Sequence, residues 1–261
     1  MSNSSKNNQK EDVVFNKFKN QLECRGFNIE SVDEDGFIHI NIEESDLKIS
    51  LENVRRNYKR DSDESHIDDL IDVIVSNSAK NEDWITAKDK LYIQFFPNDF
   101  DFENIVNEKV TNEFSKVFAL KINNGFSFIT EDDLSKWKID FNELEEQADF
   151  NLGILLDKVT IEFEDIDNHQ LGMINVEEVS LKSSFLFSSK VKDFVQDIIG
   201  FPFYAVMPVR DFCYIFSEKD FDYFCQRLGS VVLEEYNNSG YPITTEILRF
   251  SETGVEAIGK Y

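Results

Sequence analysis

Residues 200–216, GFPFYAVMPVRDFCYIF, are the stretch from which the expected fold is built. Two apolar runs, 203–206 and 212–216, are typical of neighbouring strands, and Pro208 interrupts them. The charged pair Arg210-Asp211 stands between the two runs. Charged side chains inside a buried strand pair must be paired or solvated. The stretch therefore predicts a strand pair that carries either a structural ion pair or a functional site.

Strand and helix signals alternate outward from this stretch. Short apolar runs bounded by turn residues predict strands, and apolar positions three or four apart predict helices. The predicted strands are 91–96, 159–163 and 244–250, the predicted hairpin is 118–130 with its turn at 123–125, and the predicted helices are 141–157, 185–199 and 221–235. Thr130 precedes three acids and is placed to cap a further helix. Because short hairpins outnumber long crossovers, we expect an α+β fold with mixed or mainly antiparallel sheets flanked by amphipathic helices.

The first part of the chain has its own pattern of elements. A polar leader, 1–12, is expected to be disordered. The remaining signals predict a helix over 13–27, a hairpin of strands 37–42 and 47–51, and helices over 52–58 and 63–75. We therefore divide the chain into the leader, an N-terminal α+β segment over 13–85 and a main α+β domain over 86–261.

Charge and cysteine content restrict the partners and the compartment. The chain of 261 residues has a formal net charge of −24 and contains 25 Phe, which predicts an acidic surface around an aromatic core. Such a charge argues against direct binding to nucleic acid or to an anionic membrane, and it suits a basic protein partner. The start of the chain lacks an apolar signal segment, and no apolar run could span a bilayer. Three widely spaced cysteines, Cys24, Cys213 and Cys225, are expected to be free thiols. These features predict a cytoplasmic protein.

Four short motifs follow one another along the chain. They are the helical AxxNL element at 148–152, the P-x-R-D element at 208–211, the YPIT end at 241–244, and the helix ENVRRNY at 52–58, which is similar to an NLYREY-type helix. In these motifs the chain, best over residues 139–261, resembles the bacterial YtpQ-like family, an uncharacterised family of the domain-of-unknown-function type. The family has no established activity, so the resemblance implies a fold and no reaction.

Arg210 and Asp211 are the first candidate site. The guanidinium of Arg210 is always charged and has the planar fork that matches a carboxylate or a phosphate. Neighbouring residues of a strand face opposite ways, so Arg210 and Asp211 are not expected to pair with each other. Arg210 either faces a pocket or partner, or it pins the turn after Pro208 by pairing with Glu218 or Asp220.

The second candidate is an acidic stretch. Residues 131–167 contain thirteen acids and three lysines. On the helix from Phe141, the acids Glu143, Glu146 and Asp149 lie three apart, which predicts one exposed row of carboxylates. The buried stripe of this helix is predicted to comprise Phe141, Leu144, Ala148, Leu152 and Leu155.

Other motifs for catalysis or metal binding are weak. Asp35 with Asp46 and Lys48 is superficially similar to a metal-dependent nuclease site, but a nuclease needs a basic surface for its substrate. The histidines His39, His66 and His169 are isolated in the sequence, and 165–169 lacks the glycine and glutamate of a calcium loop. We expect no cofactor and no metal.

The sequence thus favours a non-enzymatic acidic binding protein that engages a basic protein partner through Arg210, Asp211, Glu143, Glu146 and Asp149. An immunity or inhibitory protein of a bacterial conflict or defence system fits this description. Two alternatives stay open: a hydrolase or nuclease-like enzyme that uses Arg210 with carboxylates, and a DNA mimic whose carboxylates imitate phosphates.

Overall fold

The computed structural model describes residues 12–42, 45–77, 83–122 and 125–261. The chain forms two compact units, Met1–Lys80 and Asn81–Tyr261. Except for Asp12, the predicted leader 1–12 lies outside the described residues, and so do the first two residues of the turn predicted at 123–125.

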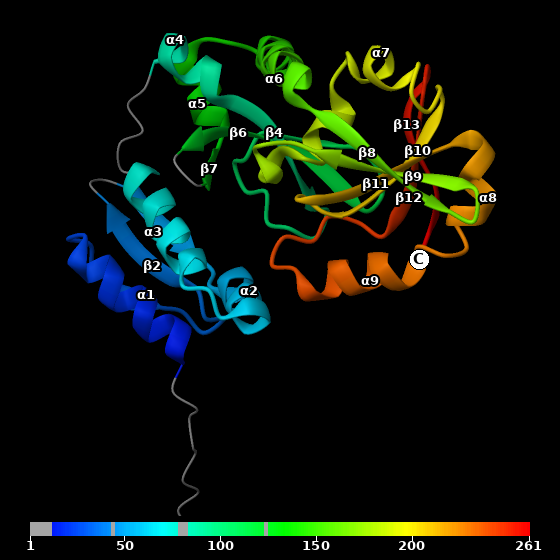
Figure 1. The fold of residues 1–261 in the computed structure, drawn as a ribbon. Coiled ribbons are helices and arrows are strands. Elements are labelled where there is room, and N and C mark those ends of the chain that lie inside the picture. Colours follow the sequence, from blue (N-terminus) through cyan, green and yellow to red (C-terminus); the bar gives the residue numbers. More distant parts are fainter. Residues whose placement is uncertain (1–11, 43–44, 78–82, 123–124) are drawn as a thin grey trace, which may run out of the picture. The chain divides into compact units, whose positions relative to one another are not determined.

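The first unit packs three helices on a small antiparallel sheet (Figure 1). Its elements are α1 (Val13–Cys24), β1 (Ser31–Val32), β2 (Ile38–Ile42), β3 (Ser45–Ile49), α2 (Glu52–Asp61) and α3 (Ser65–Asn77), with the sheet order β1-β2-β3. The Asp12 carboxylate caps α1 by accepting a hydrogen bond from the Phe15 amide at 3.0 Å. Phe18 and Leu22 of α1 and Ile40 of β2 are fully buried. The helical and alternating patterns of the sequence therefore point to the residues that form this core.

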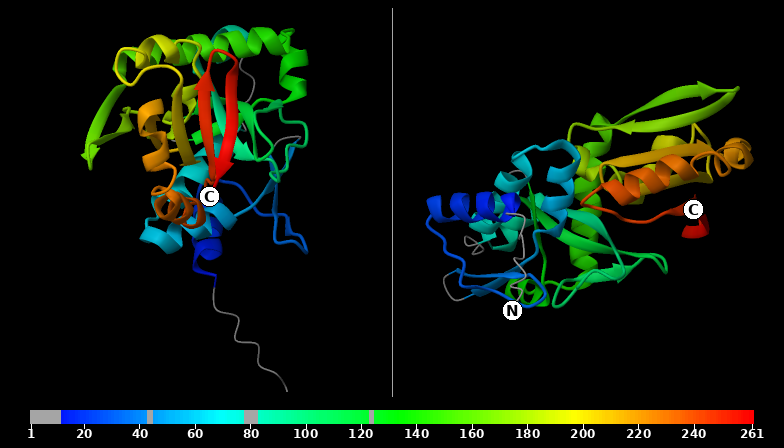
Figure 2. Two further views of the ribbon diagram at one scale, coloured as in Figure 1. Left: turned by 90° about the vertical axis from the view of Figure 1, so that its right-hand side faces the viewer. Right: turned by 90° about the horizontal axis from the view of Figure 1, so that it is seen from below.

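The second unit contains two antiparallel sheets. The four-stranded sheet has the order β4-β6-β5, with β7 also paired to β6, and comprises β4 (Leu91–Pro97), β5 (Asn107–Lys109), β6 (Phe114–Ile122) and β7 (Gly125–Phe128). The six-stranded sheet has the order β13-β12-β10-β11-β9-β8 and comprises β8 (Thr160–Ile166), β9 (His169–Asn175), β10 (Phe203–Val209), β11 (Phe212–Ser217), β12 (Glu246–Ser251) and β13 (Gly254–Lys260). The β8–β9 hairpin forms one edge of this sheet and the β12–β13 hairpin the other (Figure 2).

Helices cover these sheets. They are α4 (Trp84–Ala87), α5 (Glu131–Trp137), α6 (Phe141–Leu155), α7 (Val191–Val195), α8 (Phe221–Phe224) and α9 (Gly229–Asn238), with 3₁₀ turns η1 (Lys88–Lys90), η2 (Leu156–Lys158), η3 (Val179–Leu181), η4 (Ser184–Phe187) and η5 (Glu218–Asp220). Thr130 starts α5 with a complete capping box, as its position before the acids predicted. In Figure 1, α6 lies above the strands and contacts β4, while α9 lies below them and contacts β10. The predicted α+β class with mainly antiparallel sheets is confirmed.

Two long helices expected from the sequence are interrupted. The predicted helix 185–199 is only η4 and α7, because Ser188 between them has an extended backbone with ψ of 138°. The predicted helix 221–235 is α8 and α9, with Gly229 starting the second piece. Strands β9 and β13 were not expected, and each is the partner strand of a hairpin. Apolar periodicity alone does not distinguish one long helix from two shorter segments, so it predicts each of these as continuous.

Pro208 does not end its strand. It lies inside β10, where the pairing with β11 shifts register between Val206 and Val209. A proline cannot donate to the ladder, and it is tolerated at such an irregularity. Its carbonyl accepts a hydrogen bond from the Ile243 amide at 2.7 Å.

Within the part of the chain that the structure describes, no helix combines the length and apolar character needed to cross a lipid bilayer.

Candidate functional site

The site is built on α6, whose two faces differ in character. The Asp140 carboxylate caps the helix by accepting from the Glu143 amide at 2.9 Å. Leu144, Ala148 and Leu152 point into the core and are buried, as the helical pattern predicted. Burying this stripe fixes the rotation of α6 and turns the opposite face to solvent.

The acidic row predicted on α6 is only partly exposed. Glu143 and Glu146 are exposed, and neither forms an ion pair within the described residues. Asp149 is half-buried, and its carboxylate accepts hydrogen bonds from the Ser189 amide at 2.8 Å and from the Ser189 hydroxyl. A helix advances about 100° per residue, so each step of three residues falls back about 60° toward the buried side. This drift explains why Asp149 stabilises the segment before α7 instead of facing solvent.

Beyond Glu146, the solvent-exposed side of α6 is continued by two apolar side chains and not by Asp149. Phe150 and Ile154 are 58% and 53% exposed, although both are large and apolar. Each step of four residues advances about 40° around the helix axis. Phe150 and Ile154 therefore lie within about 80° of Glu143 and Glu146 around that axis. We call these four residues, Glu143, Glu146, Phe150 and Ile154, the outer face of α6. Sequence reasoning missed its apolar half, although a helical projection places both residues opposite the buried stripe.

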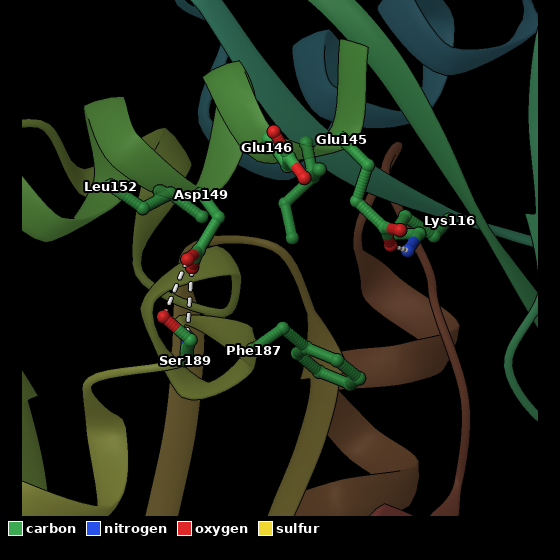
Figure 3. Close-up of a pocket in the computed structure, with 8 residues that line it drawn as sticks. Lys116, Glu145, Glu146, Asp149, Leu152, Phe187 and Ser189 are labelled. Atoms are coloured by element: carbon green, nitrogen blue, oxygen red, sulfur yellow. Dashed lines mark hydrogen bonds and ion pairs between the residues drawn. The ribbon is translucent and has the colours of Figure 1, made fainter. Parts of the chain in front are cut away.

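A cavity of about 290 Å³ adjoins the acidic side of α6 (Figure 3). It is lined by Ile93, Lys116, Glu145, Glu146, Asp149, Leu152, Phe187 and Ser189. Lys116 is 12% exposed and bonds both Glu145 and Glu108, the latter at 2.6 Å. Figure 3 shows the Lys116–Glu145 pair and the Asp149–Ser189 bonds on either side of the Phe187 ring. Glu146 is thus the lining carboxylate that has no partner among the described residues.

Arg210 and Asp211 form a turn, not the middle of a strand. They connect β10 to β11 across the pair Val209 and Phe212, and Asp211 is exposed. The Arg210 guanidinium carbon lies 3.6 Å from the centroid of the Tyr241 ring. The Ser183 amide donates to the Arg210 carbonyl at 3.1 Å and anchors the turn.

The alternative in which Arg210 pins the turn by pairing with Glu218 or Asp220 is wrong. Within the described chain Arg210 forms no ion pair; its guanidinium stacks on the Tyr241 ring, and the Asp220 carboxylate bonds Ser217 and His169. No hydrogen bond or ion pair between described residues joins the Arg210 turn to the acids of α6. The structure therefore does not bring the two predicted sites together.

His169 has a partner that sequence reasoning did not find. Its Nδ1 lies 2.9 Å from Oδ1 of Asp220, a carboxylate with only 3% of its side chain exposed. The Ser217 hydroxyl donates to the other Asp220 oxygen at 2.7 Å, and the imidazole stacks on the Tyr223 ring. In a catalytic triad the serine would bond the imidazole instead. The arrangement therefore orients His169 without providing it with a nucleophile.

The residues of the nuclease-like motif do not form a site in the part of the chain that can be described. The ammonium of Lys48 lies 4.2 Å from the Phe37 ring centroid, and the Asp46 side chain lies outside the described residues. Among the residues described, no group of three or more His, Cys, Asp and Glu side chains is placed to hold a metal ion.

No family model, curated protein or solved structure matches the chain. The resemblance to the YtpQ-like family therefore stays a prediction.

Proposed function

We propose that this protein is a non-enzymatic binding protein that docks a basic protein partner on the outer face of α6. The observation that carries the proposal is a juxtaposition on one helix face. Glu143 and Glu146, which have no ion-pair partner among the described residues, lie beside the exposed apolar side chains of Phe150 and Ile154. Exposed apolar side chains beside polar ones are typical of interaction surfaces.

Charge supports a basic partner in particular. The net charge of −24 attracts cations over a long range, and 131–167 holds thirteen of the acids. Electrostatic attraction raises the rate of association, whereas desolvated apolar contacts slow dissociation. The two halves of the outer face therefore have separable kinetic roles. The carboxylates raise the association rate of the partner, and Phe150 and Ile154 lower its dissociation rate.

This description suits an immunity or inhibitory protein of a bacterial conflict or defence system, acting in the cytoplasm. A basic toxin or a nucleic-acid-binding enzyme has the cationic surface that such a face would cover.

The experiment begins with a photocrosslinking amino acid at Phe150 in cells, with the same group at Glu162 as control. The partner captured only from Phe150 is purified, and its binding kinetics are measured at several salt concentrations. For Glu143→Lys combined with Glu146→Lys, we expect the association rate to fall about tenfold or more at low salt. Phe150→Ala with Ile154→Ala should instead raise the dissociation rate.

A matched control separates the docking face from general charge. Glu162→Lys with Glu164→Lys changes the net charge equally, and both residues are exposed on β8. This control should slow association much less than the α6 pair. Equal effects of the two charge reversals, or an unchanged dissociation rate in the apolar variant, would remove α6 as the docking face. Circular dichroism confirms that each variant is folded, since exposed charges contribute little to stability.

A further inference from the structure

A buried carboxylate faces a second cavity in the unit Asn81–Tyr261. Glu246, the first residue of β12, is 5% exposed. Its Oε2 accepts hydrogen bonds from the hydroxyls of Thr111 at 2.6 Å and Thr244 at 3.1 Å. Its Oε1 receives no hydrogen bond from any described residue. One side of the carboxylate is therefore fixed, and the other is open to a donor.

The cavity lies between the edges of the two sheets. Its volume is about 500 Å³, and it is lined by Lys109, Val110, Thr111, Asn112, Glu246, Val255, Glu256 and Ala257. The first four residues belong to β5 and the loop that follows it, and the last three belong to β13. The cavity is open to solvent, and Val110 and Val255 add apolar surface beside the polar groups of Thr111, Asn112 and Glu246.

Most charges around the cavity already have partners. Glu256 pairs with Arg249 at 2.7 Å. Lys260, the cross-strand neighbour of Glu246, bonds Glu113 at 3.0 Å. The pKa of Lys260 is raised chiefly by that bond to Glu113, with a smaller contribution from Glu246. Lys109 is exposed at the rim. Because a buried carboxylate is stabilised by a cation that bonds it, the open Oε1 favours a positively charged ligand.

We propose that this cavity binds a small molecule that carries a primary ammonium group on an alkyl chain. An ammonium is a compact charge that one open carboxylate oxygen can accept, whereas a guanidinium prefers both oxygens of a carboxylate. Here two threonine hydroxyls already occupy Oε2, which disfavours the guanidinium. The apolar surface of Val110 and Val255 can contact the alkyl chain. The site is separate from the outer face of α6, so this inference stands or falls independently of the proposed partner.

Three probes with the same alkyl chain test the chemistry: pentylamine, pentanol and pentylguanidine. Each is titrated into the full chain labelled with ¹⁵N, and the amide resonances of Thr111 and Ala257 are followed by NMR. We expect saturable shifts with pentylamine, about tenfold weaker binding of pentylguanidine, and no saturable shift with pentanol. Equal binding of pentanol or pentylguanidine, saturation by calcium chloride at the same resonances, or amine-induced shifts only elsewhere would overturn the proposal.

Variants identify the residue responsible. Glu246→Gln should weaken pentylamine binding about tenfold or more, whereas Glu252→Gln, an exposed site on the same hairpin, should leave it unchanged. Lys109→Ala removes a like charge and should tighten binding about twofold. If Glu246→Gln does not fold, pentylamine binding is measured in Ala257→Phe instead. The phenylalanine side chain fills the cavity from the exposed β13 and leaves the Glu246 carboxylate in place. Unchanged binding in either folded variant, Glu246→Gln or Ala257→Phe, contradicts the assigned site.

Discussion

Replacing Asn151 by alanine removes a polar contact that joins α6 to the first strand of its unit. The Asn151 side-chain nitrogen donates to the carbonyls of Lys88 at 2.6 Å and Leu91 at 2.8 Å. The Asn151 side-chain oxygen accepts a hydrogen bond from the side-chain nitrogen of Gln147 at 2.9 Å. A typical intramolecular hydrogen bond contributes about 1 kcal/mol net, and a buried group left without a partner costs about 1–3 kcal/mol. The bond to Leu91 is buried. We therefore expect Asn151→Ala to lower the free energy of unfolding by about 3 kcal/mol.

Tryptophan fluorescence during urea unfolding measures this loss in the correct unit. The chain has two tryptophans, Trp84 and Trp137, and both lie in the unit Asn81–Tyr261 with ring centroids 5.4 Å apart. For a domain of this size, about 3 kcal/mol corresponds to a fall in Tm of roughly 6–12 °C. Asn142→Ala is the matched control, because Asn142 is exposed on the same helix. Alanine has the higher helix propensity, so this control should change stability by about 0.5 kcal/mol or less, in the stabilising direction.

The outcome that refutes this reasoning is an Asn151→Ala protein within about 1 kcal/mol of the wild type, the contribution of a single ordinary bond. In that case the Leu91 carbonyl would have acquired another donor. A loss in Asn142→Ala equal to that in Asn151→Ala would show that the effect does not depend on the contacts of Asn151, because the higher helix propensity of alanine cannot lower stability.

Three further predictions concern thiols, alkaline pH and the Arg210 turn. Cys24 is exposed and Cys213 buried, so a thiol reagent should modify Cys24 in the native protein but Cys213 only after unfolding; rapid native modification of Cys213 would contradict its burial. Burial raises the pKa of Cys213 from 9.0 to about 12 and that of Tyr261 from 10.0 to about 12. Their stabilisation is complete below the unfolded-state pKa values and is lost as pH rises toward 12, so the urea midpoint should fall between pH 9 and 12; a flat profile would argue against both shifts. Arg210→Ala should cost only about 1 kcal/mol, the value of a partly exposed cation–π contact with Tyr241; calorimetry that finds several times this loss would indicate a missed buried partner.

Local rules account for much of the fold. The side chain of Thr130 bonds the backbone of α5, three residues away, so its cap can be predicted from the chain alone. The buried stripe of α6 follows from helical spacing in the same way, since Leu144 and Leu152 lie on one side of any helix formed there. The turn at Asp167 and Asn168 needs two residues with positive φ, and both residue types tolerate that conformation.

The candidate sites depended on the tertiary structure instead. Asp149 lies on the helix that was predicted, but only the position of Ser189, forty residues later, made it a half-buried structural group. His169 meets Asp220 because β9 lies beside β11 in the sheet. Glu246 gained its cavity together with Thr111, which lies 135 residues earlier, in the loop after β5 of the other sheet. Helix caps and apolar stripes are interactions between residues a few positions apart, and the sequence by itself determines them. Pairings such as these depend on strand order and register, which are set when the whole chain packs.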